Sequence, residues 1–283
     1  MPPLDTLFDR HEGRPLPLPR ALLGRYGGPL GFPAPRGRPL VFSNFVTTLD
    51  GVVSYDIPRQ AHAGIISRSS DEDRFVLGLL RACADVVVVG AGTLRAEPDG
   101  EWTPDFAYPA AAAPFAALRR AMGKAGQPAV AFVTASGDLD LDAGAFKADQ
   151  PIVILTTKMG ARRLGRHPRN VDVQVMDGPA PSARHIVTAL ATRLGARRIL
   201  TEGGPTLMGR FLKDRVLDQM FQTIAPQIAG RSAAHRRLAL VEDLAFRPQD
   251  APWSRLLSVK RSADDLLFLR LAVRPQARAS SRS

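Results

Sequence analysis

The sequence has very little cysteine: Cys83 is the only one among 283 residues. A single cysteine excludes an internal disulfide framework and a zinc site built from several thiolates. The histidines lie far apart, without the short spacing that zinc ligands favour, so we expect no metal. No apolar run is long enough for a signal peptide or a membrane span, and a reducing cytoplasm fits this composition best.

Acidic residues are scarce relative to basic ones, which gives a net charge of +11. The excess comes from three segments: 1–38 carries a net +3, 158–169 a net +5 and 274–283 a net +3. A broad basic face is therefore not indicated, and we expect no nucleic acid as a partner. Because the basic segments exist, a non-catalytic nucleotide- or RNA-binding module remains as an alternative from another class of protein.

The chain divides into three stretches by composition. Residues 1–38 are rich in proline, glycine and arginine and lack a sustained periodicity, which predicts an extended arm over the body or over a partner subunit. Residues 39–273 contain no internal repeat or linker and are expected to form one domain. Residues 274–283 are expected to form a disordered basic tail.

Strands and helices alternate through most of this domain, which predicts an α/β fold with a mostly parallel sheet and helices on both faces. Parallel strands are expected at 40–48, 85–92, 129–134, 151–156, 171–176 and 197–201. Helices are expected from Ser70, over 182–194 and from Pro205, with a loop and helix insertion at 102–128. Antiparallel strands are expected at 218–226, 255–262 and 266–273, the last two as a C-terminal hairpin.

The first segment that could carry chemistry is TTLDG (residues 47–51), directly after a buried strand. Its acid, Asp50, stands at the carboxyl edge of the expected sheet, where α/β enzymes bind their ligands. The alternative is an Asp-Gly turn that only reverses the chain, which the dipeptide alone favours.

The second segment is GAGTLR (residues 90–95), which also follows an apolar strand. Gly90 and Gly92 permit a close approach of the backbone to a phosphate or a ring. The segment is not the dinucleotide fingerprint, because Arg95 occupies the place of the third glycine. Alone, it is weak evidence for a ligand.

The third segment is TEGGPTL (residues 201–207), in which a strand delivers Glu202 and Pro205 takes a first-turn position in the next helix. Free N–H groups at the helix start and the hydroxyl of Thr206 form a plausible pyrophosphate cradle. The alternative is a tight strand-to-helix turn without a ligand, and the pattern leaves both interpretations open.

The fourth segment joins a strand end at Thr156 to a basic stretch that includes Arg162 and Arg163. Hydroxyls and arginines in this order suit the 2′-phosphate that distinguishes NADPH from NADH. A solvated helix face is the equally supported alternative.

Taken together and in this order, these segments resemble the reductase (C-terminal) domain of the bifunctional deaminase/reductase of riboflavin biosynthesis. The similar stretches are NFVTTLDGVVS, LLRACADVVVVGAGTLRAEP and ILTEGGPTLMGRFLKDRVLDQMFQTIAPQIAG, and the resemblance covers residues 39–273. It implies a dihydrofolate-reductase-like fold, usually as a homodimer built through the sheet region. The His-x-Glu and Cys-x-x-Cys signatures of the zinc deaminase are absent, so we expect only the reduction.

The resemblance also implies roles for individual positions. Asp50 matches the acid at the mouth of the cleft, and Arg81 and Glu202 match positions that contact the substrate. Positions that match the surroundings of NADPH are Thr93, Glu97, Thr134 or Ser136, and the turn formed by Gly203, Gly204, Pro205, Thr206 and Leu207.

In the reaction of that family, NADPH gives a hydride to the ribose C1′ of 5-amino-6-(5-phosphoribosylamino)uracil and produces the ribitylamino compound. The resemblance therefore implies an NADPH-dependent pyrimidine reductase with a small phosphorylated substrate. We expect Asp50, or a water that it holds, to donate or orient the proton, and Glu202 to bind N–H groups of the pyrimidine.

Two departures from the family pattern concern the substrate phosphate. Val52 and Val53 follow Gly51, where the family usually has Arg or Lys, and the stretch 101–104 lacks the family's basic residue. Arg81 is the candidate that remains for the phosphate. The departures favour the alternative of a same-fold NADPH reductase that acts on another heterocycle, such as a pterin.

Overall fold

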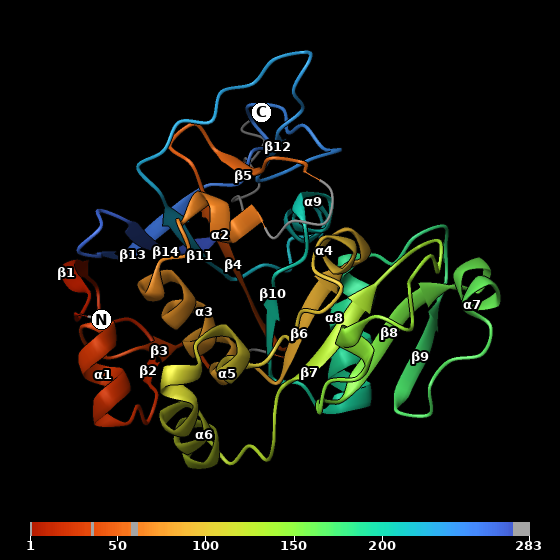
Figure 1. The fold of residues 1–283 in the computed structure, drawn as a ribbon, viewed down its shortest axis with the longest axis horizontal. Helices are drawn as coiled ribbons and strands as arrows, with labels where there is room; N and C mark the ends of the chain where they lie inside the picture. The colour runs from red at the N-terminus through yellow and green to blue at the C-terminus, as the bar shows by residue number, and fades with distance from the viewer. Residues whose placement is uncertain (1, 35–36, 58–61, 274–283) are drawn as a thin grey trace, which may run out of the picture.

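The computed structural model describes residues 2–34, 37–57 and 62–273. Within these residues, one sheet contains ten strands in the order β1-β13-β14-β11-β4-β10-β6-β7-β8-β9 (Figure 1). In this spatial order the strands are β1 (Asp5–Asp9), β13 (Ser254–Arg261), β14 (Leu267–Val273), β11 (Gln219–Ile224), β4 (Leu40–Thr47), β10 (Arg198–Thr201), β6 (Val86–Gly90), β7 (Ala129–Val133), β8 (Ile152–Thr157) and β9 (Val171–Met176).

The sheet has a parallel part and an antiparallel part. All pairs from β11 through β9 are parallel, whereas β14, β13 and β1 pair antiparallel. The expected α/β fold and its C-terminal hairpin, β13 and β14, are therefore confirmed. The expectation for 218–226 was wrong in one respect: β11 is antiparallel to β14 but parallel to β4, because the crossover helix α9 (Pro205–Lys213) precedes it.

Helices cover both faces of the sheet because side chains alternate along the buried strands. Along β4, Phe42 points into one core and Val41 into the other. The first core receives buried residues of α1 (Arg20–Tyr26), α3 (Asp71–Cys83), α4 (Ala91–Ala96), α6 (Ala112–Ala121) and α7 (Lys158–Leu164). The second receives those of α8 (Ala183–Leu194) and α9. The insertion expected at 102–128 contains α6 and the short α5 (Pro104–Ala107).

A small lobe rises beyond the carboxyl ends of the parallel strands (Figure 1). It contains β5 (Val52–Ser54), which pairs antiparallel with β12 (Leu238–Ala239), and α2 (His62–Ile66) packs beside β5. We call residues 48–57 and 227–242 the lobe. The sequence patterns did not indicate this pairing, because 184 positions separate Ser54 from its partner Leu238 and neither strand exceeds three residues, which is too short to show a periodicity.

The N-terminal segment differs from the extended arm expected over 1–38. It contains β1, α1 and a short antiparallel pair, β2 (Arg14–Pro15) and β3 (Gly31–Phe32). Leu22 and Leu30 are fully buried in the first core, together with Phe32. The expectation failed because the apolar residues of this segment are widely spaced and their partners lie at the far end of the chain, where β1 pairs with β13.

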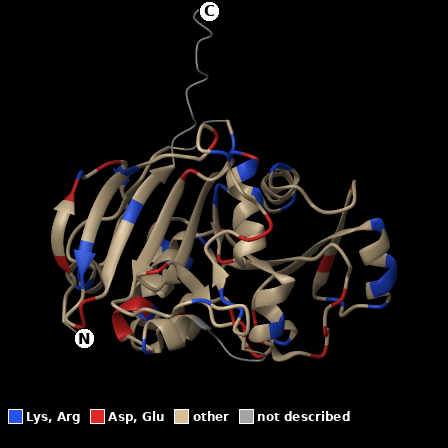
Figure 2. Cartoon of the chain, turned by 90° about the horizontal axis from the view of Figure 1, so that it is seen from above, with Lys and Arg blue, Asp and Glu red and all other residues tan. Residues whose placement is uncertain are grey.

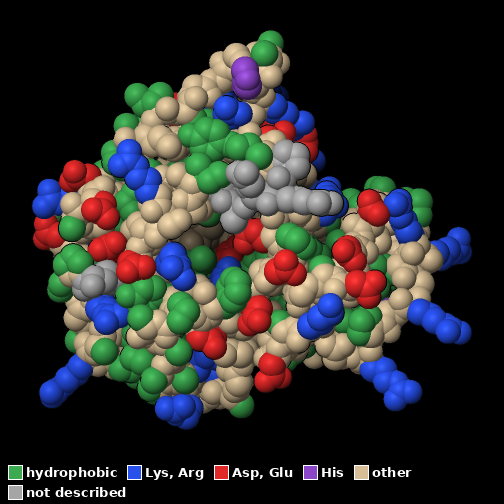
Figure 3. Space-filling model, in the orientation of Figure 1, with side chains coloured by type: hydrophobic (Ala, Val, Ile, Leu, Met, Phe, Trp, Pro, Cys, Tyr) green, Lys and Arg blue, Asp and Glu red, His purple; other side chains and the backbone are tan. Residues whose placement is uncertain are grey.

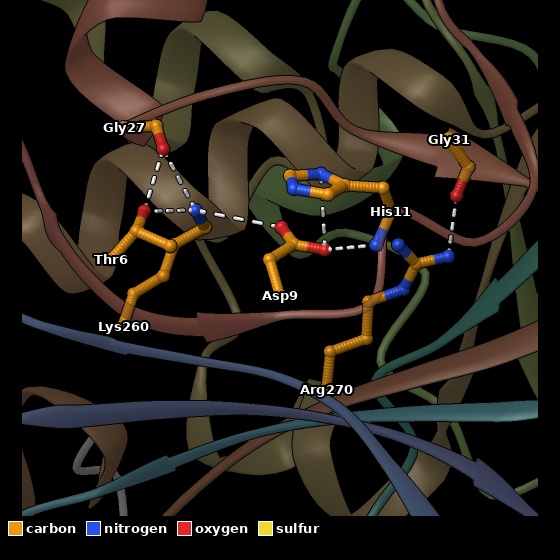
Figure 4. A network of polar contacts seen from close by, with 7 residues as sticks. All are labelled: Thr6, Asp9, His11, Gly27, Gly31, Lys260 and Arg270. Atoms are coloured by element: carbon orange, nitrogen blue, oxygen red, sulfur yellow. Dashed lines mark hydrogen bonds and ion pairs between the residues drawn. The ribbon is translucent and has the colours of Figure 1, made fainter.

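Two buried cations bind this segment to the C-terminal hairpin (Figure 4). Lys260, which is 1% exposed, donates hydrogen bonds to the Thr6 hydroxyl (2.7 Å) and to the Gly27 carbonyl (3.0 Å). Arg270 donates to the Gly31 carbonyl. Burial lowers the pKa of Lys260, because its charge loses the water that would solvate it at the surface. Carbonyl groups of the N-terminal segment thus take the place of water around both cations.

The tail expected at 274–283 lies outside the described residues. Within the described ranges, the helices are all too short or too polar to cross a bilayer.

Candidate active site

The carboxyl edge of the parallel strands is stepped. Thr201 at the end of β10 pairs with Ser43 of β4, but β4 continues to Thr47. At a rise of roughly 3.3 Å per residue, β4 therefore extends about 13 Å beyond β10. We call the turns after β10 and β6 (202–206 and 90–97) the floor, and the end of β4 with the lobe the wall. The face in Figure 3 is hollowed near its centre, below the projecting lobe.

A buried ion pair is the central feature of the floor. Arg81 of α3 donates from Nε to Oε1 of Glu202 (2.9 Å) and from Nη2 to Oε2 (2.7 Å). Its Nη1 donates to the carbonyls of Glu101 and Thr103. The Arg81 and Glu202 side chains are 6% and 9% exposed. Arg81 therefore fixes the orientation of Glu202, and little of its guanidinium is left for a substrate phosphate.

Glu97 is a second acid of the floor, directly after α4. Burial raises its pKa, the positive charge of Arg81 opposes this rise, and the negative charge of Glu202 adds to it. Glu97 therefore retains a proton more readily than an ordinary glutamate.

The two glycine turns of the floor lie against each other. A Cβ atom added to Gly90 would lie 3.6 Å from the Gly204 nitrogen, and one added to Gly204 would lie 3.6 Å from the Thr93 hydroxyl. Gly90 has φ −80° and Gly204 φ −58°, so the backbone does not require glycine at either place. A Cβ at the exposed Gly92 would meet no protein atom within 4 Å. Gly92 therefore leaves open space beside the backbone, whereas a Cβ at Gly90 or Gly204 would be in ordinary contact with the neighbouring turn.

The helices that start at these turns leave backbone N–H groups without a side-chain cap. In α9, Pro205 has no N–H and Leu207 donates to the Gly204 carbonyl (2.9 Å), so the N–H of Thr206 remains in the first turn. The cap residues of α4 and α9 are Gly90 and Gly204, and neither helix has a side-chain hydrogen bond at its start. Pro205 takes a first-turn position of α9, as expected. Unpaired N–H groups and the positive helix ends favour an anion.

Other residues of the third segment have structural tasks. Thr206 donates a hydrogen bond to Asp243 (2.8 Å), so its hydroxyl is already engaged. Leu207 is buried and packs where a Cβ on Gly203 would clash with it. Gly203 is thus required by the packing of the turn.

The turn after β7 lies beside the turn of β6 in the sheet order. Thr134 is buried, and its hydroxyl accepts from the Gly137 N–H (3.0 Å), which shapes this turn. Ser136 is exposed at its tip. Arg163 reaches back from α7 to Asp138 (2.9 Å). Ser136 and Arg163 are therefore accessible from the same side, whereas Thr134 is not.

The basic helix α7 lies at the far end of this row of strand ends, and Figure 2 shows its Lys and Arg positions, in blue, together at one edge of the molecule. Arg162 and Arg163 are exposed. Thr156 is 0% exposed and packs against Gly160, so it cannot contact a ligand in this conformation.

Asp50 forms the wall's turn and also fastens the lobe. Gly51 has φ +79°, which favours glycine and matches the expected Asp-Gly turn. The carboxylate of Asp50 accepts from the Thr48 hydroxyl (2.5 Å), the Ala229 N–H (3.1 Å) and the Gly230 N–H (2.8 Å). These bonds lower the pKa of Asp50 to about 2, the Thr48 hydroxyl most strongly. Asp50 is thus ionised at neutral pH.

Sequence reasoning missed the basic residues of the lobe. Arg237 stacks on the Tyr55 ring (4.8 Å), Arg236 lies near Asp56 (3.9 Å), and Arg231 donates to the Asp50 carbonyl (3.2 Å). The sequence signal was the stretch GRSAAHRR (residues 230–237), but only the pairing of distant segments places it beside Asp50.

A wide hollow of about 1260 Å³ lies at the opposite edge of the sheet, where the strands begin. Arg119, Lys124 and Gln150 line it, and none of the expected site residues does. Because ligands of α/β sheets bind at the carboxyl edge, the candidate site is the hollow below the lobe and not this one.

The family model of the RibD C-terminal domain matches residues 39–268 of this chain. The chain belongs to this family. A curated relative is a 2,5-diamino-6-ribosylamino-4(3H)-pyrimidinone 5′-phosphate reductase of Archaeoglobus fulgidus, 24% identical over 68% of this chain and 83% of its own length.

Solved structures share the fold of this RibD C-terminal domain. A pyrimidine reductase-like protein of Corynebacterium diphtheriae has a TM-score of 0.65 at 20% identity, with 92% of this chain and 96% of that chain covered. A bifunctional deaminase/5-amino-6-(5-phosphoribosylamino)uracil reductase of Thermotoga maritima has a TM-score of 0.62 at 20% identity, with 84% of this chain covered. This chain spans 57% of the Thermotoga protein.

Proposed function

We propose that this protein is an NADPH-dependent reductase of riboflavin biosynthesis that converts 5-amino-6-(5-phosphoribosylamino)uracil into the ribitylamino product. The observation that carries the proposal is the floor, where Glu202, oriented by Arg81, lies beside two adjoining glycine turns. Membership of the RibD C-terminal domain family and the reductase activity in the name of the Archaeoglobus relative support it.

The cofactor would lie along the row of strand ends. The uncapped N–H groups at the starts of α4 and α9 would hold its pyrophosphate, and Gly92 leaves room beside the first of them. Ser136, Arg162 and Arg163 would face the 2′-phosphate, the group that NADPH carries and NADH lacks. Thr93 and Gly92 would line the space between. Thr134, Thr156, Gly203 and Leu207 would support these contacts from within the protein.

When bound, NADPH supplies the hydride. Glu202 would accept hydrogen bonds from N–H groups of the pyrimidine, and Arg81 would hold its carboxylate in that orientation. Asp50 has a pKa of about 2, so it would orient a water or a substrate hydroxyl rather than give up a proton of its own. Burial raises the pKa of Glu97, so this acid of the floor would retain a proton more readily than Asp50.

A same-fold reductase of another heterocycle, such as a pterin, is the second candidate. Arg81 is engaged by Glu202 and two carbonyls, and the residues after Gly51 are the buried Val52 and Val53. Both observations favour a substrate without a phosphate.

We also propose that two copies pack through the antiparallel part of the sheet. Met220 and Ile224 of β11 lie opposite Leu271 and Leu267 of β14, and Leu269 lies between them on the same face. All five are only half-buried. A second copy would cover this apolar strip. The unaltered protein is expected to sediment as a dimer and Leu269→Glu as a monomer in analytical ultracentrifugation. A monomeric unaltered protein would contradict the dimer, and a dimeric Leu269→Glu would contradict this interface.

The deciding experiment measures NADPH oxidation with 5-amino-6-(5-phosphoribosylamino)uracil, with dihydrofolate in parallel. Turnover of the pyrimidine that is lost in Glu202→Ala is the expected result. Turnover of dihydrofolate alone would support the second candidate.

Gly204→Leu is expected to abolish NADPH binding, measured by fluorescence. Binding of neither cofactor nor substrate by the unaltered protein would support a non-catalytic module. A cytoplasmic location, which the buried reduced thiol of Cys83 suits, is part of the proposal.

A further inference from the structure

The basic residues of the lobe differ in how far their charges are neutralised. Arg236 lies 3.9 Å from Asp56 and 4.0 Å from Glu242. Arg237 donates to the Tyr55 carbonyl (3.1 Å) and stacks on that ring. Arg231 is exposed and makes one described hydrogen bond, from Nη2 to the Asp50 carbonyl (3.2 Å); within the described residues, no carboxylate lies at ion-pair distance from it. Most of its N–H groups are therefore free for a ligand.

Arg231 is held in place from the wall. The carboxylate of Asp50 accepts the N–H groups of Ala229 and Gly230, the two residues before Arg231. A Cβ atom added to Gly51 would lie 3.8 Å from Nη2 of Arg231. The guanidinium therefore lies over the Asp50-Gly51 turn. Arg231, which comes from a distant segment, thus supplies a cation beside this turn. The local sequence after Gly51 supplies only the buried Val52 and Val53.

A phosphorylated substrate needs such a cation on the wall. Its pyrimidine end would lie on the floor at Glu202, and β4 extends roughly 13 Å beyond that level. The buried Arg81 cannot bind the phosphate without releasing Glu202. A guanidinium with free N–H groups is suited to two parallel hydrogen bonds to phosphate oxygens.

We propose that Arg231 binds the 5′-phosphate of the substrate and makes the enzyme select phosphorylated over dephosphorylated pyrimidines. This inference rests on the proposed function. The nearby Asp50 carboxylate faces the Ala229 and Gly230 amides, so its charge is compensated on that side. Glu242 and Asp56 lie against Arg236.

The kinetic test compares Arg231→Ala with Arg236→Ala, which removes the same charge from the same lobe. A charged hydrogen bond contributes about 1.5–3 kcal/mol, so Arg231→Ala should raise KM for the phosphorylated pyrimidine by roughly 10- to 100-fold. KM for the dephosphorylated compound should change no more than in Arg236→Ala. Arg231→Lys should recover part of the loss. Equal KM changes in Arg231→Ala and Arg236→Ala would overturn the proposal.

A binding measurement separates this proposal from the function on which it rests. Calorimetric titration with ribose 5-phosphate should show binding to the unaltered protein and to Arg236→Ala, but not to Arg231→Ala. Failure of the unaltered protein to reduce the pyrimidine would reject the proposed function and leave this result interpretable. If Arg231→Ala binds ribose 5-phosphate normally but raises KM for dihydrofolate, Arg231 binds a carboxylate and the phosphate assignment is wrong. Circular dichroism of each variant checks that it is folded.

Discussion

The floor and the wall of the cleft use charge in opposite ways. On the floor, Arg81 and Glu202 are buried, and nearly every N–H of the guanidinium has a protein partner. On the wall, Asp50 and Arg231 are exposed, and Arg231 keeps most of its N–H groups free. A buried pair sets the orientation of one carboxylate at a high cost of desolvation, whereas exposed groups adapt to a ligand at low cost. The floor is thus built for positioning and the wall for capture.

The largest expected effect tests the floor. Glu202→Ala would leave the Arg81 charge buried without its carboxylate, which should lower the free energy of unfolding by about 3–5 kcal/mol. Urea denaturation followed by fluorescence measures this loss. Exchanging both residues for methionine should cost less than Glu202→Ala alone. A loss below about 1 kcal/mol in Glu202→Ala would mean that the pair is as weak as a surface ion pair.

Asp50→Ala tests the wall. It removes the acceptor for Ala229 and Gly230, and the expected loss of stability is about 1–2 kcal/mol because the site is exposed. Since the folded pKa of Asp50 is about 2 and its ordinary value is 3.8, its contribution is present above about pH 4 and disappears as the pH falls toward 2. Faster hydrogen exchange of the Ala229 and Gly230 amides over that range would show the loosening; exchange that is independent of pH, after correction for the intrinsic rate, would contradict it.

Glu97→Gln probes the floor by pH. Burial raises the folded pKa of Glu97 above its ordinary value of 4.5, so the unaltered protein loses stability as the pH rises from 4.5 through the folded pKa. Glutamine does not ionise, so the variant should melt at a higher temperature than the unaltered protein at pH 8 and at the same temperature near pH 4. Calorimetry at the two pH values measures the difference. A difference that does not vary with pH would show that ionisation is not its cause.

The smallest effect is expected at the exposed end of the strand row. Arg162 and Arg163 are exposed, so screening by salt should limit the loss in Arg162→Ala and Arg163→Ala to a several-fold rise in KM for NADPH, with KM for NADH unchanged. Kinetics with both cofactors at low and high salt provide the measurement. An unchanged KM for NADPH at low salt would identify this helix as a solvated face.

The parallel half of the sheet could be predicted from the sequence because its information is local. The run of valines in β6 is flanked by a capped helix and by glycines, and each signal lies within a few residues of the element that it marks. The glycine turns and the Glu202 position were found in the same way. The N-terminal segment and the lobe could not be found so, because Lys260, Thr6, Asp50 and Arg231 acquire their meaning from partners far away in the chain.

The pairing of Arg81 with Glu202 shows a second limit. Both residues were expected at the substrate, and the sequence does not reveal that the guanidinium is already occupied by protein carbonyls. Such information depends on the packing of α3 against the segment 101–103.

The contacts of Lys260 constrain the order of events during synthesis. Its partner Thr6 leaves the ribosome 254 positions earlier, so β1 must wait until nearly the whole sheet has been made before it finds β13. Contacts of such long sequence separation form slowly, and until they form, two cations and an apolar face lack their cover. We therefore expect the N-terminal segment to dock last. In a nascent chain arrested before β13, this segment would stay exposed to chaperones and proteases.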